Sequence, residues 1–108
     1  MAVAQVYDPV AGATVDQQAL YEYMSYLSED CYCAGWMEGT EAACWEAVVN
    51  GGTRFGIGFI TAEEAAELRR LSETAGGWWH WPENGRNPEF VSIEEWQRIY
   101  GRIWKRRS

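Results

Sequence analysis

Three helix-start signals divide the chain and constrain its fold. Each is a hydroxyl residue followed three positions later by Gln or Glu, and together the two residues form a capping box. The pairs are Thr14 with Gln17, Thr61 with Glu64, and Ser92 with Glu95. In a capping box each side chain accepts a hydrogen bond from the other residue's backbone N–H, which satisfies two donors at the start of a helix. The pairs therefore predict helices that begin directly after residues 14, 61 and 92.

Apolar spacing indicates how far the first of these helices runs. A stripe at helical spacing predicts a helix to about residue 27, and its members are Leu20, Tyr23, Met24 and Leu27. Ser28 is a candidate N-cap for a second helix, which is expected to run to Val49 and stop at Asn50, Gly51 and Gly52. Two separate helices and one long bent helix both remain open for residues 14–49.

Residues 50–60 are rich in glycine and predict a connector rather than a regular element. Its large apolar residues are expected to plug the core, and they are Phe55, Ile57 and Phe59. The helix after Thr61 is expected to end near Ala75, because two glycines follow it.

The chain after residue 77 contains two short aromatic runs on either side of Asn84-Gly85, and this pattern predicts a small hairpin. The final helix is expected to bury one apolar face, formed by Ile93, Trp96, Tyr100 and Ile103. The fold class is therefore mainly α: a compact domain of three to four helices with a small aromatic β-hairpin.

A length of 108 residues fits one domain spanning residues 1–108. Its expected parts are an N-terminal arm (1–13), an acidic helical half (14–49), the connector (50–60), and a helix, hairpin and basic C-terminal helix (61–108). No apolar run approaches the roughly 20 residues of a membrane helix, so no membrane partner is expected. No signal peptide is apparent in residues 1–13, which favours a cytoplasmic protein.

Charge is distributed unevenly along the chain. The total is 16 acidic and 9 basic residues, for a net charge of -7, and residues 1–50 contain no Lys or Arg. The acids of this half are Asp8, Asp16, Glu22, Glu29, Asp30, Glu38, Glu41 and Glu46. Such a field repels bulk nucleic acid and suits a protein partner with a basic surface.

Tyr26 is the strongest candidate for contact with such a partner. Glu22 lies one helical turn before it, and Glu29 and Asp30 lie one turn after it. An aromatic ring among carboxylates fits an arginine-rich surface through cation–π and ion-pair contacts. The simpler interpretation is that Tyr26 is a half-exposed surface tyrosine with no binding role. The residues predicted to bind a partner are Glu22, Tyr26, Glu29, Asp30, Glu38 and Trp79.

The chain contains seven tryptophans. Trp36, Trp45 and Trp96 occupy helical positions compatible with the core. Neighbouring residues of a strand face opposite sides, so Trp78 and Trp79 cannot share one face of the hairpin. An exposed aromatic face and the filling of a small core both remain open for the run Trp78–Trp81.

A basic stripe on the last helix supports alternative functions. Its members are Arg98, Arg102, Lys105 and Arg106. With the tryptophans of the hairpin, they are able to hold phosphates and stack bases, although the net charge disfavours direct binding of nucleic acid. The same stripe matches the acidic half of a second copy, in a homodimer. A small structural or assembly protein is a further alternative.

No pattern for catalysis, metal or cofactor stands out. His80 is the single histidine and lies in an aromatic run, and no nucleophile–base pattern accompanies it. Cys31, Cys33 and Cys44 lack a Cys-x-x-Cys knuckle, so we expect reduced, buried thiols and no metal site. The chain is accordingly expected to be a binding protein without a cofactor and not an enzyme.

Three stretches carry a resemblance: Cys33–Gly39, Gly76–Trp81 and Ser92–Trp96. In these stretches the chain resembles small uncharacterised proteins of bacteriophages and prophages. The resemblance implies a short acidic protein, acting in the cytoplasm of a host cell, that binds and blocks a host protein. Anti-CRISPR proteins are similar in size and charge, and by that analogy the blocked protein handles nucleic acid or takes part in defence.

Overall fold

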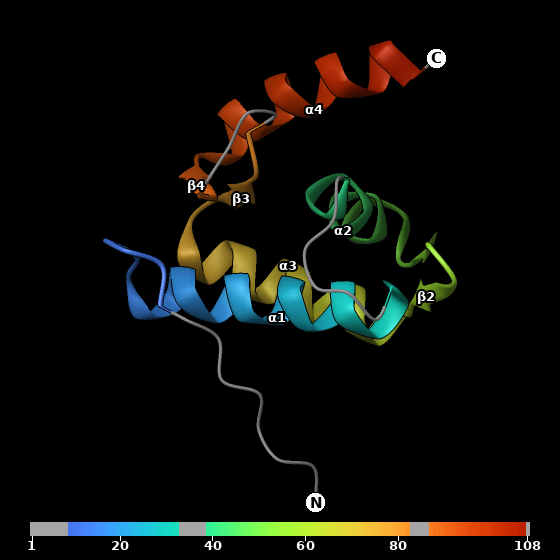
Figure 1. Ribbon diagram of the computed structural model, residues 1–108, viewed down its shortest axis with the longest axis horizontal. Coiled ribbons are helices and arrows are strands. Elements are labelled where there is room, and N and C mark those ends of the chain that lie inside the picture. The colour runs from blue at the N-terminus through green and yellow to red at the C-terminus, as the bar shows by residue number, and fades with distance from the viewer. Residues whose placement is uncertain (1–8, 33–38, 83–86, 108) are drawn as a thin grey trace, which may run out of the picture.

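Four helices and two β-hairpins make up the described part of the chain, residues 9–32, 39–82 and 87–107 of the computed structural model (Figure 1). The helices are α1 (Val15–Tyr32), α2 (Thr40–Asn50), α3 (Ala62–Ala75) and α4 (Ile93–Arg107). The strands are β1 (Thr53–Phe55), β2 (Gly58–Ile60), β3 (Trp78–His80) and β4 (Glu89–Val91). The protein is mainly α with minor β, as predicted.

The predicted helix starts are confirmed by their hydrogen bonds. The Thr14 hydroxyl accepts from the Gln17 N–H at 3.1 Å, and the Gln17 side chain accepts from the Thr14 N–H at 3.0 Å. Thr61 and Glu64 form the same reciprocal pair, and α3 ends at Ala75 as expected. At α4, the Ser92 hydroxyl accepts from the Glu95 N–H at 3.1 Å.

The expected cap at Ser28 is wrong. Helix α1 continues through Ser28 to Tyr32, and the Ser28 hydroxyl is buried, 3.3 Å from the hydroxyl of Thr40. The next described helix begins only at Thr40, after Gly39 in a left-handed conformation with a φ of 91°. A residue with this φ does not continue a right-handed helix, so α1 and α2 are two separate helices.

The glycine-rich connector is a hairpin. Strands β1 and β2 pair in antiparallel fashion, with Thr53 opposite Ile60 and Phe55 opposite Gly58. Strand residues alternate between two faces, so Phe55 and Ile60 point into the core and are 4% and 0% exposed. Phe59 lies on the other face and Ile57 lies in the turn, and both are exposed. The expectation that Ile57 and Phe59 plug the core is therefore wrong.

The helices are arranged in three levels (Figure 1). Helices α1 and α3 pack side by side, α2 packs on them, and α4 lies beyond α2. The main core lies between α1, α2 and α3, and its fully buried side chains include Leu20, Met24, Leu27, Cys44, Ala47 and Leu68. The hairpin β3–β4 connects α3 to α4 and joins the two ends of this arrangement.

Tryptophans attach α4 to the rest of the molecule. Trp96 of α4 is fully buried, with ring centroids 6.4 Å from both Trp45 of α2 and Trp78 of β3. Trp45 meets Trp78 edge to face at 5.3 Å. The placement of Trp45 and Trp96 in the core is confirmed, with Trp45 half-buried at its edge. Trp36 lies outside the described residues.

Strand β3 of this hairpin is buried on both faces. Trp78 and Trp79 point to opposite sides, as the strand geometry requires, yet they are 0% and 2% exposed. Trp78 faces α2 and α4, whereas Trp79 faces α1 and donates its indole N–H to the Gln17 carbonyl at 2.7 Å. Of the two alternatives open for this run, the filling of a small core therefore holds for Trp78 and Trp79, because helices cover both sides of the strand.

Trp96→Ala is expected to lower the free energy of unfolding by about 3–5 kcal/mol, since it leaves a large cavity among packed rings. Chemical denaturation followed by far-UV circular dichroism measures this loss. Trp104→Ala, on the same helix, is the matched control because Trp104 is 54% exposed. Its expected cost is below about 1 kcal/mol. Equal losses in the two variants would contradict the proposed attachment of α4 through Trp96.

Candidate functional site

Helix α1 presents an acidic face to solvent. Glu22, Tyr26 and Glu29 follow one another at spacings of four and three residues, on the side opposite Leu20 and Met24. Tyr26 is 48% exposed, and Asp30 beside it is exposed. We call Glu22, Tyr26, Glu29 and Asp30 the acidic face of α1. Four of the six residues predicted to bind a partner thus come together on one surface.

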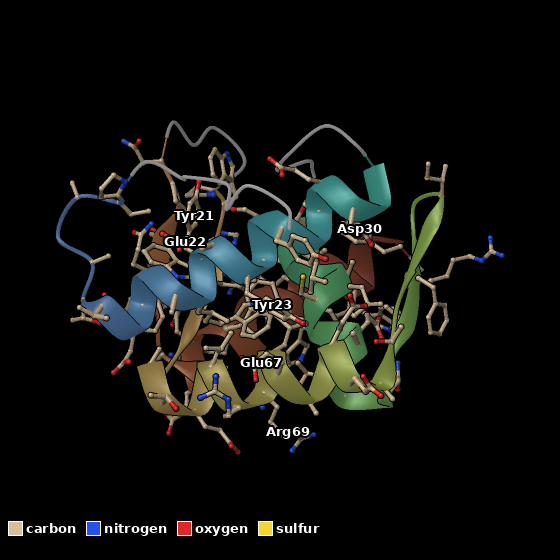
Figure 2. All side chains as sticks on the ribbon, turned by 90° about the horizontal axis from the view of Figure 1, so that it is seen from below. Tyr21, Glu22, Tyr23, Asp30, Glu67 and Arg69 are labelled. Atoms are coloured by element: carbon tan, nitrogen blue, oxygen red, sulfur yellow. The ribbon has the colours of Figure 1, made fainter. Side chains whose placement is uncertain are left out.

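Two tyrosines give this surface an aromatic component. The rings of Tyr23 and Tyr26 stack with centroids 6.1 Å apart and planes inclined by 24°. Figure 2 shows Tyr23 between α1 and α3, near Glu67. Burial, together with the charges of Glu64 and Glu67, raises the pKa of Tyr23 to about 12. Two carboxylates of α3 thus also act on the tyrosine pair of α1.

Nearby cations do not cancel the negative field of the acidic face. Arg69 of α3 donates to the Val48 carbonyl at 3.1 Å, on the side of α3 that meets α2 (Figure 2). Arg70 forms an exposed ion pair with Glu67 at 2.7 Å. Helix α1 itself contains no Lys or Arg. Both arginines thus have their partners outside the acidic face, where Glu22 accepts from the Gln18 side-chain amide at 3.0 Å.

Of the two other predicted binding residues, one is buried and the other lies outside the described residues. Trp79 is buried between Tyr21 and Phe90, with ring centroids at 5.7 Å and 5.3 Å, so no partner reaches it on the folded chain. Its assignment as a binding residue is wrong. Glu38 lies outside the described residues.

The basic stripe belongs to α4, which lies at the other end of the arrangement from α1 (Figure 1). Arg98, Arg102 and Lys105 are exposed there, and Arg98 pairs with Glu95 at 2.6 Å. The side chain of Arg106 lies outside the described residues. Trp78 and Trp79 are buried and offer no ring for stacking nucleic-acid bases, whereas Trp81 of the same run is half-buried.

Cys44 is a fully buried thiol in the core, as expected, whereas the side chains of Cys31 and Cys33 lie outside the described residues. Within residues 9–32, 39–82 and 87–107, no group of three His, Cys, Asp or Glu residues is placed to hold a metal ion. No helix in this described part is long and apolar enough to cross a membrane.

Sequence reasoning missed a buried carboxylate. Glu41 of α2 is 5% exposed, and its carboxylate accepts from the Trp81 N–H at 2.6 Å. His80 Nδ1 lies 3.5 Å from the same oxygen, longer than a well-formed hydrogen bond. The signal in the sequence is the position of Glu41, one turn before Trp45 and two turns before Val48, on an otherwise apolar stripe.

This carboxylate connects elements rather than serving an open site. The backbone carbonyl of Glu41 accepts from the Trp78 indole N–H at 3.1 Å. The carbonyl and the carboxylate of Glu41 thus both connect α2 to the segment that starts at β3. Burial raises the pKa of Glu41, although the bond from Trp81 and the proximity of His80 lower it in part.

A cavity of about 310 Å³ between α2, β1 and α4 is a further feature, and it has no signal in the sequence. Its wall includes Glu46 of α2, Arg54 and Phe55 of β1, and Tyr100 and Trp104 of α4. These residues come from distant parts of the sequence, and only the packing of α4 over α2 brings them together.

Comparison of the chain with protein-family models, with curated proteins and with solved structures finds no match. Function is therefore inferred below from the residues and their geometry.

Glu41→Gln is expected to change how stability depends on pH. Since folding raises the pKa of Glu41, ionisation of this carboxyl disfavours the folded state. Its contribution is fully present below the ordinary pKa of 4.5 and is lost as pH rises through the higher folded value. The unfolding free energy of the parent minus that of the Gln variant should thus fall as pH rises above 4.5 and through the higher folded pKa.

Urea denaturation at several pH values measures this difference. Both proteins carry His80→Asn, so that no imidazole titrates at the contact. A difference that rises with pH, or does not change, would contradict the burial of the Glu41 carboxyl in the folded protein.

Proposed function

We propose that the protein is a non-catalytic binding module that docks the acidic face of α1 on a basic surface of another protein. The proposal rests on the surroundings of Tyr26. Its ring is half-exposed and is bordered by Glu22, Glu29 and Asp30, on a helix that contains no Lys or Arg. Tyrosine is enriched among the residues that dominate binding energy at interfaces. The surrounding carboxylates steer a positively charged partner toward the ring.

The rigidity of α1 supports this role. Its inner face is held by Leu20, Met24 and Leu27, which are 0% exposed, and its first turn is held by the capping box at Thr14. The backbone that carries Tyr26 is therefore ordered before binding, so a partner loses little free energy to ordering this helix.

The chemistry of the partner follows from the charge. Proteins that bind nucleic acids do so through surfaces rich in Lys and Arg, and an acidic helix competes for such a surface. We therefore propose that binding inhibits a protein that handles nucleic acid. A phage-encoded protein acting in the cytoplasm of its host, as the sequence resemblance implies, is the proposed setting.

The triple variant Glu22→Lys, Glu29→Lys, Asp30→Lys is expected to abolish partner binding and leave the fold intact, because it reverses the charge around Tyr26. The parent chain and the variant are immobilised and exposed to a lysate of cells in which the protein occurs. Quantitative mass spectrometry of the retained proteins measures the loss. Proteins held through the acidic face should be basic, and single-stranded oligonucleotides should displace them.

The matched control is Glu73→Lys, Glu89→Lys, Glu94→Lys, which changes the net charge equally at exposed positions outside the acidic face. This control should retain the same proteins as the parent. Equal losses in both triple variants would show that binding follows total charge and would contradict a defined site. Raised salt should mainly slow association with the parent, since exposed charges act on the encounter.

A second copy of the chain is the other basic partner to test, because Arg102 and Lys105 are exposed on α4. Sedimentation velocity across a range of concentrations detects such self-association. A dimer that the α1 triple variant dissolves would replace the foreign partner in the proposal by the chain itself.

A further inference from the structure

The cavity between α2, β1 and α4 has the form of a small-molecule site. Its volume of about 310 Å³ is at the lower end of the range for ligand pockets. Its wall combines one carboxylate, that of Glu46, with the aromatic side chains of Phe55, Tyr100 and Trp104. None of the residues on the acidic face of α1 lines it, so the cavity is independent of the proposed docking surface.

The carboxylate of Glu46 is held in place by two neutral donors. Its Oε1 accepts from the Tyr100 hydroxyl, and its Oε2 accepts from the Asn50 side-chain amide at 3.1 Å. Each carboxylate oxygen accepts more than one hydrogen bond, so both oxygens keep capacity for a ligand. Because the two donors are uncharged, the negative charge of Glu46 is oriented without being neutralised.

The aromatic wall complements this charge. Tyr100 and Trp104 lie one turn apart on α4, with ring centroids 6.2 Å apart and planes inclined by 32°. Trp104 is 54% exposed at the edge of the cavity, whereas Phe55 is 4% exposed in its wall. Aromatic faces attract cations through the ring quadrupole, and tryptophan attracts them most strongly.

We propose that this cavity binds an alkylguanidinium group, the chemistry of an arginine side chain. A planar guanidinium donates two parallel hydrogen bonds to a carboxylate and stacks on aromatic rings, which matches Glu46 beside Tyr100 and Trp104. The alkyl stem of such a ligand covers the apolar wall formed by Phe55 and Ile103.

Arg54 distinguishes a site for a cation from a site for an anion. It lies on β1, is exposed, and contributes to the same wall as Glu46. Its positive charge repels a bound guanidinium, so its removal strengthens binding of a cation and has the opposite effect on an anion. A site for carboxylates or phosphates would instead depend on Arg54.

The test titrates n-butylguanidinium into the protein and follows the indole resonance of Trp104 by NMR. Glu46→Gln is expected to weaken binding by about tenfold or more, because it removes a charge-assisted pair. Trp104→Ala is expected to weaken it about two- to fivefold through loss of the cation–π contact, read from the Tyr100 resonances instead. Arg54→Gln is expected to tighten binding about twofold or more.

Matched controls separate the site from general charge effects. Glu73→Gln changes the net charge as Glu46→Gln does, at an exposed position on α3, and should leave binding unchanged. The neutral isostere n-butylurea should not bind. Unchanged affinity in a folded Glu46→Gln variant, or weaker binding in Arg54→Gln, would overturn the proposal. Binding of n-butylamine as tight as that of n-butylguanidinium would overturn the guanidinium assignment.

Two further experiments identify the source of the guanidinium group and test whether the cavity acts independently of the acidic face of α1. A capped Gly-Arg-Gly tripeptide that binds like n-butylguanidinium supports an arginine presented by a protein, whereas binding of n-butylguanidinium alone supports a small metabolite. The α1 triple variant should bind n-butylguanidinium normally if the site is the cavity. If n-butylguanidinium does not bind, the proposed docking role of α1 is unaffected. If α1 does not dock on a partner, the proposed cavity site is likewise unaffected.

Discussion

The burial of β3 on both faces is the constraint on which the arrangement of the helices depends. Trp78 projects to one side, where its indole N–H meets the Glu41 carbonyl of α2 and its ring meets Trp96 of α4. Trp79 projects to the other side and binds the Gln17 carbonyl of α1. A strand of three residues thus connects three helices, and large aromatic side chains let so short an element reach them all.

Both proposed sites follow from this arrangement. Trp79 and the main core hold α1 by its inner side, so Tyr26 and Asp30 on the outer side are exposed. Helix α4 is attached at its beginning, through Trp96 and Ile99, while its later residue Trp104 lies at the edge of the cavity over α2. The bond from Tyr100 to Glu46 then sets how α4 crosses α2 at the cavity.

Features of the sequence that act locally were predictable, and features that depend on distant contacts were not. The capping boxes and the end of α3 follow from residues within one turn of each other, as does the common face of Glu22, Tyr26 and Glu29. Ser28 fits a cap equally well by sequence, but contact with Thr40 places it inside α1. The sequence left the burial of Trp79 open because the helix that covers it, α1, lies about 60 residues earlier. The cavity had no sequence signal for the same reason.

The segregation of charge along the chain has a structural consequence that links the two sites. With no Lys or Arg in residues 1–50, the carboxylates of α2 take donors from later in the chain or from neutral groups nearby. Glu41 is satisfied by the Trp81 N–H, and Glu46 by the hydroxyl of Tyr100 and the amide of Asn50. Neutral donors orient a carboxylate but leave its charge in place, unlike an ion pair. The acids of α1 and α2 therefore keep a negative field at two separate surfaces, and each surface combines that field with an exposed aromatic ring suited to a cation.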